Sequence, residues 1–164
     1  MLKQNVLTLL NDQVNHELYS AYLYLSMAAY FQDKNMNGFA HWMKAQSGEE
    51  QEHGLKFFEY IFDRGEKVTL QAITAPPADW ANPLDLFEQV LRHEQKVTSL
   101  IHSIYAAAVK ENDYPTQVML HWFIDEQVEE EKNAAEIVEY LKMAGDAPGA
   151  LMMLDRQLGA RASD

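Results

Sequence analysis

Apolar side chains recur at steps of three and four residues along four long stretches of the chain. Steps of this size place side chains on one face of an α-helix, which has about 3.6 residues per turn. A helix with one apolar face must bury that face against another element, so we expect the four helices to pack as a bundle. The periodicity predicts long helices over about residues 6–33, 38–64, 84–110 and 116–143, and a short fifth helix over about 148–158.

The connection between the second and third helices is much longer than the others. It covers about residues 66–83, contains Pro76, Pro77 and Pro83, and shows no helical period. At roughly 3.3 Å per residue it reaches about 60 Å, whereas a helix of about 28 residues is roughly 42 Å long. It can therefore cross the whole bundle and start the third helix parallel to the second. The predicted fold is all-α: one domain over 1–164, a four-helix bundle with a single long crossover loop and a short C-terminal fifth helix.

Composition excludes several classes of protein. The chain is 48% hydrophobic and carries a net charge of -12, which argues against disorder and against binding to nucleic acid. It has no cysteine, so disulfides, thiolate zinc sites and iron–sulfur clusters are excluded. The most apolar run, residues 21–31, is too short to span a membrane, and residues 1–5 do not resemble the start of a signal peptide. We expect a cytoplasmic protein with no membrane or nucleic-acid partner.

An acid interrupts each of the four apolar stripes near its middle. Burying unpaired carboxylates costs several kcal/mol each, and four together would repel one another. Divalent cations at the centre of the bundle would neutralise them; without metal, shared protons and raised pKa values are expected. A histidine and a glutamine lie on the same faces, each three residues from one of the acids. The set is Glu17, Glu50, His53, Glu94, Gln127 and Glu130.

The ligand types favour a hard or borderline ion. Carboxylates, an imidazole and an amide suit Fe(II) or Mn(II), and zinc could compete. Two ions about 3.5–4 Å apart, bridged by a carboxylate, would explain why several acids share one place. Taken singly, each residue has a structural explanation: a glutamate can sit at a helix edge, and His53 or Tyr24 can be a packing residue. The remaining histidines fall off the stripes and are predicted to lie on the surface: His16, His41, His93, His102 and His121.

These motifs, taken together, resemble the non-haem bacterial ferritins, a family of ferritin-like di-iron proteins. The resemblance covers essentially the whole chain, including the crossover loop and the fifth helix. The residues that carry it are Glu17 with Tyr24, Glu50-x-x-His53, Glu94 and Gln127-x-x-Glu130.

The resemblance implies a ferroxidase centre that holds two irons per subunit, with Glu50 as the bridge. One iron would be bound by Glu17, Glu50 and His53. The other would be bound by Glu50, Glu94 and Glu130, with Gln127 close by. Tyr24 and Trp122 match aromatic residues beside the family's centre. The family also has a third iron site, which would use Glu49, Glu126, Glu129 and Glu130; from the sequence alone these acids look like a solvated face.

The implied function is iron storage and detoxification. Fe(II) would be oxidised to Fe(III) by O2 or H2O2 and mineralised inside a homo-oligomeric shell of roughly 24 subunits. Bacterioferritins have a second Glu-x-x-His where this chain has Gln127-x-x-Glu130, and a haem-ligating methionine at the position of Gln51. We therefore expect no haem. Gln117 and Leu120 stand where animal heavy chains have acids that line an iron channel, which leaves the uptake route open.

Three other functions remain as alternatives. A di-iron oxidoreductase acting on a small substrate would need a pocket and usually two Glu-x-x-His pairs. A mini-ferritin that removes peroxide would typically lack the fifth helix and often has a basic tail, whereas residues 1–5 contain only Lys3. A non-catalytic helical interaction module would bind no stoichiometric Fe(II).

Overall fold

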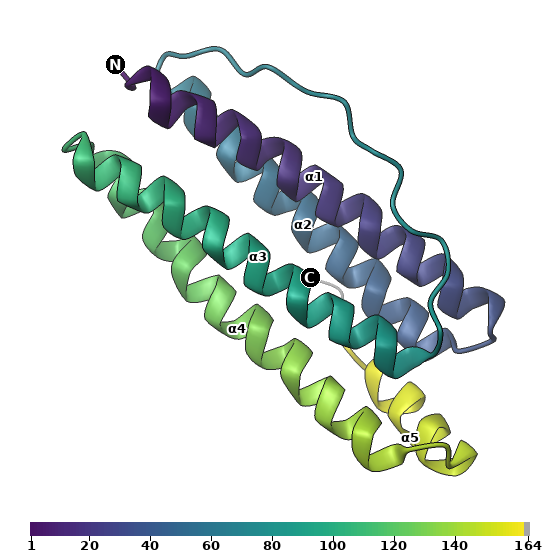
Figure 1. The fold of residues 1–164 in the computed structure, drawn as a ribbon. Coiled ribbons are helices and arrows are strands. Elements are labelled where there is room, and N and C mark those ends of the chain that lie inside the picture. The colour runs from purple at the N-terminus through teal and green to yellow at the C-terminus, as the bar shows by residue number, and fades with distance from the viewer. Residues whose placement is uncertain (163–164) are drawn as a thin grey trace.

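The computed structural model describes residues 1–162, which form five α-helices joined by three short connections and one long one (Figure 1). No strand occurs in these residues, and none of their helices is long and apolar enough to cross a membrane. Each helix end lies within two residues of the predicted position, and the all-α fold class is confirmed. The helices are α1 (Gln4–Asp33), α2 (Asn37–Asp63), α3 (Pro83–Lys110), α4 (Tyr114–Ala144) and α5 (Pro148–Gly159).

Helix α4 begins two residues before its predicted start because Asp113 caps it. The Asp113 carboxylate accepts a hydrogen bond from the backbone N–H of Thr116 at 3.3 Å, and Pro115 lies in the first turn. Arg64, just beyond the end of α2, donates to the same carboxylate at 2.9 Å. The cap thus also ties the turn between α3 and α4 to α2.

The long connection between α2 and α3 runs the length of the bundle beside α1, so that α3 starts parallel to α2 (Figure 1). Hydrogen bonds hold it to α1 at two levels. The side chain of Asn11 accepts from the backbone N–H of Thr69 at 2.7 Å, and the Ser26 hydroxyl donates to the carbonyl of Pro77 at 2.6 Å. The connections from α1 to α2 and from α3 to α4 are short, so each of these two pairs of helices packs as antiparallel neighbours.

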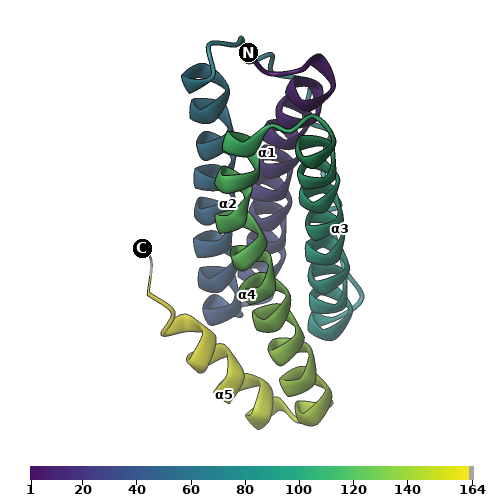
Figure 2. The ribbon, with the colours of Figure 1, turned by 90° about the vertical axis from the view of Figure 1, so that its left-hand side faces the viewer.

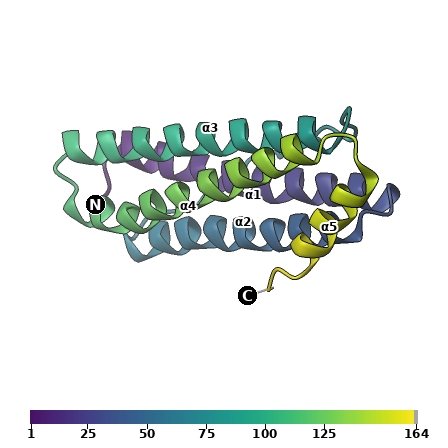
Figure 3. The same ribbon diagram turned by 90° about the horizontal axis from the view of Figure 1, so that it is seen from below.

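Helix α5 crosses the end of the bundle where α2 begins and α4 ends (Figures 2 and 3). Its Asp155 carboxylate accepts hydrogen bonds from the backbone N–H groups of Gly38 and Phe39, at 2.9 and 3.0 Å. A carboxylate at this place satisfies N–H groups in the first turn of α2 and complements the helix dipole. The sequence predicted α5 but not this contact.

The core consists of two apolar clusters, one toward each end of the bundle. The first is built around Phe31, Phe39 and Phe87, and the second around Phe57 and Phe123. On each long helix, buried polar residues lie between the stretches that contribute to the two clusters. Because each large apolar side chain contributes about 1.5–3 kcal/mol when buried, the two clusters can offset the cost of a polar layer between them.

Candidate metal centre

The acids in the middle of the four stripes are all buried. The exposed fraction is 1% for Glu17 and Glu94, 2% for Glu50 and 5% for Glu130. These values exclude the explanation that they are helix-edge residues pointing into solvent. Each long helix therefore directs one carboxylate into the polar layer of the core.

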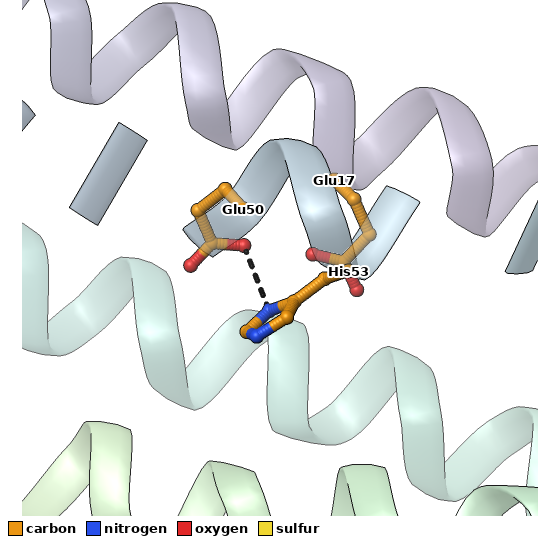
Figure 4. A group of neighbouring side chains, drawn as sticks. All are labelled: Glu17, Glu50 and His53. Carbon is orange, nitrogen blue, oxygen red and sulfur yellow. Dashed lines mark ion pairs between the residues drawn. The ribbon is translucent and has the colours of Figure 1, made fainter. Parts of the chain in front are cut away.

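Glu17 on α1 faces Glu50 and His53 on α2 (Figure 4). Glu50 and His53 are three residues apart, so their side chains leave the same face of the helix. The His53 Nδ1 atom lies 3.5 Å from Glu50 Oε2, and one ligand atom from each of the three residues fits within 4.8 Å of the others. The Oε2 atom of Glu17 is buried and has no hydrogen-bond partner. Two carboxylates and an imidazole in this arrangement could hold one divalent cation.

A second group of possible ligands shares the same imidazole. One atom each from His53, Glu126 and Glu130 also lie within 4.8 Å of one another. The Nε2 atom of His53 is 4.0 Å from Glu126 Oε1, while Nδ1 faces Glu50. The ring is held edge-on against Trp122, with 5.4 Å between centroids. His53 thus has one nitrogen toward each group.

Glu94 is engaged by hydrogen-bond donors on both of its oxygens. The Tyr24 hydroxyl donates to Oε1, and the amide of Gln127 donates to Oε2 at 3.2 Å. The second iron is expected to be bound by Glu50, Glu94 and Glu130. Within residues 1–162, these three do not form a group whose ligand atoms all lie within 4.8 Å of one another. Tyr24 is fully buried, as a packing residue would be, and it also contacts this carboxylate.

The four acids expected at a third iron site are only partly brought together. Glu126 and Glu130 share a group with His53, as described. Glu49 is instead paired with Arg161, whose Nη2 lies 2.6 Å from Glu49 Oε2. Glu129 is exposed and joins neither group.

Two buried glutamines belong to the site and were missed by the sequence analysis. The Gln13 amide donates to Glu17 Oε1 at 2.8 Å. The Gln46 amide donates to Glu130 Oε2 at 2.7 Å and to Glu50 Oε1 at 3.4 Å. Each glutamine precedes a buried glutamate of its own helix by four residues, which places both on one face. That spacing was the signal that could have identified them.

The buried carboxylates favour their protonated forms, as expected for the centre without metal. Burial raises the pKa of Glu17 and of Glu50 well above the ordinary range, and the neighbouring charges of Glu50 and Glu94, respectively, raise them further. Burial, together with the charge of Glu94, raises the pKa of Glu130 to about 8. Burial also raises the pKa of Glu94, against the opposing effect of the hydrogen bonds from Tyr24 and Gln127.

The prediction that the other histidines lie on the surface is wrong for three of them. His93 is half-buried, and its Nε2 lies 2.7 Å from the Ser20 hydroxyl oxygen. Burial, with the nearby charge of Lys96, lowers the pKa of His93 to about 4. His16 and His41 are also half-buried. A helix inside a bundle buries a face wider than a stripe of one residue per turn, and the prediction neglected this width. His102 and His121 are exposed, as predicted.

Comparison with known proteins agrees with the geometry. A sequence profile of the ferritin-like domain family matches residues 7–144. The bacterial non-heme ferritin of Staphylococcus aureus (strain USA300) is 41% identical over 164 residues, which are 100% of this chain and 99% of that protein. The protein of the same name from Staphylococcus saprophyticus is also 41% identical over the full chain.

Solved structures give the same result. An open-pore ferritin from the archaeon Archaeoglobus fulgidus superimposes with a TM-score of 0.98 at 43% identity, over 99% of both chains. A humanized archaeal ferritin gives a TM-score of 0.99 at 42% identity, over 100% of this chain and 99% of the other. The similarity in sequence and in structure extends over the whole chain, including the crossover loop and α5. This protein therefore belongs to the ferritin family.

Proposed function

We propose that this protein detoxifies and stores iron by oxidising Fe(II) to Fe(III) with O2 at the centre of its own bundle. The observation that carries the proposal is the buried group Glu17, Glu50 and His53, with the unpartnered Oε2 of Glu17. Oxygen-rich ligands with one imidazole suit Fe(II) and stabilise Fe(III) more strongly, because the harder and more highly charged ion gains more from carboxylates. Each Fe(II) bound there would give up one electron and become Fe(III), so that two Fe(II) and two protons would convert one O2 to H2O2.

A second iron would be held by Glu50, Glu94 and Glu130, with Gln127 nearby. Glu50 would then bridge the two ions. For this, Glu94 would exchange its hydrogen bond from Gln127 for a metal contact while keeping the one from Tyr24, and Glu130 would lose a proton. A pair of bridged ions can deliver two electrons to one O2 molecule. Tyr24, beside Glu94, would orient that carboxylate.

A third iron would use Glu49, Glu126, Glu129 and Glu130. These residues continue from the buried group toward solvent: Glu130 is buried, Glu126 is half-buried and Glu129 is exposed. An ion at this place could pass between the paired centre and the outside. The proposal includes no haem, since Gln51 is an exposed residue that offers no axial ligand for haem iron.

Storage requires a container, and we propose a homo-oligomeric shell of roughly 24 subunits, in the cytoplasm. The support is the similarity to ferritins over the full chain and the large apolar side chains that a single subunit leaves exposed. On α1 these include Tyr22 and Leu25, and on α5 Met152 and Met153. Such side chains are typical of surfaces that other subunits cover.

Stopped-flow oxidation of Fe(II) tests the catalytic part. We expect Glu50→Ala to abolish the fast phase, because the residue contacts both proposed ions. Glu52→Ala is the matched control: Glu52 lies on the same helix and is exposed. A Glu50→Ala variant that oxidises iron at the wild-type rate would exclude this centre as the site of oxidation.

Light scattering after size exclusion, followed by aerobic iron loading, tests storage. A shell of roughly 24 subunits that retains many irons per subunit supports the proposal. A monomer or dimer that binds only two irons would indicate a di-iron enzyme instead. Absence of stoichiometric Fe(II) binding under anaerobic conditions would indicate a non-catalytic helical module.

A further inference from the structure

Residues 160–162 follow α5 (Figure 2), and Arg161 among them lies against the side of α2, where it contacts His41 and Trp42. Arg161 is held there by several contacts. The ring nitrogen Nε2 of His41 donates to the Arg161 carbonyl at 2.8 Å, and the guanidinium carbon lies 4.7 Å from the centroid of the Trp42 ring. Arg161 is thus held to α2 both by its backbone carbonyl and by its side chain.

The guanidinium group of Arg161 reaches two residues of α2: Glu49, an acid of the expected third iron site, and Gln46, which contacts candidate ligands. Its Nη2 donates to Glu49 Oε2 at 2.6 Å, and its Nη1 donates to Gln46 Oε1 at 3.0 Å. Arginine can only donate, so this contact turns the oxygen of the Gln46 amide toward Arg161. The amide nitrogen then faces the centre, where it donates to Glu130 at 2.7 Å.

We propose that Arg161 is a positioning residue of the metal centre, acting as a tethered cation that competes with an outer metal ion for Glu49 and orients Gln46 toward Glu130. The inference rests on the proposed function, because it assigns Glu49 to the third iron site. It adds a residue from the C-terminal end of the chain to a site otherwise built from α1 to α4.

The geometry places Arg161 in competition with an ion that binds Glu49 through Oε2. The side chains of Arg161 and Glu49 are only 21% and 29% exposed, so solvent screens their interaction less than that of a surface pair. An ion bound by Glu49 would lie beside a fixed positive charge and repel it. The coupling is reciprocal: the factor by which bound Arg161 weakens the affinity of Glu49 for the outer ion equals the factor by which the bound ion weakens the contact of Arg161 with Glu49.

Binding of the outer ion would also change the inner ligands. When Arg161 leaves, the Gln46 amide loses the contact that fixes its orientation and can release Glu130. Glu130 belongs to both the paired centre and the outer set in the proposed function. Occupation of the outer site would thus be coupled to the availability of an inner ligand, through one arginine and one amide.

Titration of the assembled, full-length apoprotein with Zn2+ by isothermal calorimetry tests the inference. We expect Arg161→Ala to bind the weakest stoichiometric ion about fivefold or more tightly than the wild type, a typical size for coupling between sites. Arg161→Lys, which keeps the charge, should restore most of the wild-type affinity. Arg156→Ala is the control, because Arg156 lies exposed on α5, and its variant should behave as the wild type.

A double-mutant cycle with Glu49→Gln separates competition at Glu49 from a general structural effect. The gain in affinity from Arg161→Ala should disappear in the Glu49→Gln background; a gain that persists there overturns the inference. So does a protein that binds two ions per subunit and no third, or one whose third affinity is unchanged by Arg161→Ala. Failure to bind any stoichiometric ion would instead overturn the proposed function itself.

Discussion

At the scale of single residues, Glu17 shows how the protein prepares a site for a cation. One carboxylate oxygen accepts a hydrogen bond from Gln13, while the other is buried without a partner. A buried oxygen in this state is costly unless it binds a proton or a metal ion. Burial raises the pKa of Glu17 well above its ordinary value, which favours a bound proton on the carboxyl group in the absence of metal.

Removal of the Gln13 amide should lower the free energy of unfolding more in the metal-free protein than in the metal-bound protein. Gln13→Leu leaves both oxygens of Glu17 without a protein partner, and we expect it to lower the free energy of unfolding of the metal-free subunit by about 1–3 kcal/mol. Saturating Zn2+ should reduce the loss, because the ion binds the carboxylate. Chemical denaturation with and without Zn2+ measures both values.

Gln95→Leu is the control for this experiment, since Gln95 is exposed on α3. Its effect should stay within about 0.5 kcal/mol. An equal loss for Gln13→Leu with and without Zn2+ would show that Gln13 only packs, and that the ion does not reach Glu17.

Some residues of the site could be predicted from the sequence and others could not. Glu17 and Glu94 interrupt apolar stripes, and a charge in an apolar row is conspicuous. Gln13 and Gln46 are neutral, so a helical pattern accommodates them at the core or at its edge alike. The contact between Arg161 and Glu49 joins residues 112 positions apart, and no local periodicity contains that information.

At the scale of helices, most of the fold follows from two features: the apolar stripes of the four long helices and the length of the crossover loop. The four apolar faces and the crossover loop determine which helices are long and which neighbours are antiparallel. The docking of α5 is different, because periodicity shows that a helix has an apolar face but not which surface covers it. The contact between Asp155 and the start of α2 therefore becomes visible only in three dimensions.

Two glycines of α2 should respond in opposite ways to the same substitution. A Cβ atom on Gly38 would lie 1.6 Å from the carbonyl oxygen of Asp155, whereas one on Gly48 would meet nothing within 4 Å. Gly38→Ala must therefore displace α5, and we expect faster proteolysis of the C-terminal segment and a clear loss of stability. Gly48→Ala should stabilise the subunit by up to about 1 kcal/mol, because alanine favours the helix.

Limited proteolysis and thermal unfolding of the two variants measure these effects. A Gly38→Ala variant with wild-type resistance at its C-terminus would mean that α5 does not pack closely against α2. The sequence alone gave no reason to distinguish glycines within α2. The distinction comes from the backbone of α5, which approaches Gly38 and leaves Gly48 open.

At the scale of the whole molecule, the bundle holds a layer of buried acids between two apolar clusters. Without metal, this layer favours bound protons, because the pKa values of its acids are raised. The unfolded chain has ordinary carboxyl pKa values near 4.5 and binds fewer protons than the folded chain above that pH. The four acids therefore make the stability of the metal-free protein fall as the pH rises, against an opposing contribution from His93, whose pKa is lowered from 6.5 to about 4 in the folded chain.

The fall should extend from about pH 4.5 to about pH 8, the folded-state pKa of Glu130. Glu130 alone would contribute a loss on the order of 5 kcal/mol per subunit across this range. Asp113 does not affect this window. Although burial opposes the shift, its hydrogen bond from Arg64 lowers the pKa of Asp113, so its contribution is lost only below its ordinary pKa of 3.8.

Calorimetric Tm values between pH 5 and 8.5, with and without Zn2+, would measure this dependence directly. The metal-free Tm should decrease with pH, and the Zn2+-loaded Tm should stay level or rise, because metal replaces the protons on the same oxygens. A metal-free Tm that rises through this range would mean that the acids are ionised and already paired in the folded protein. The polar layer would then be a structural network, and its unpartnered oxygen would no longer argue for a metal ion.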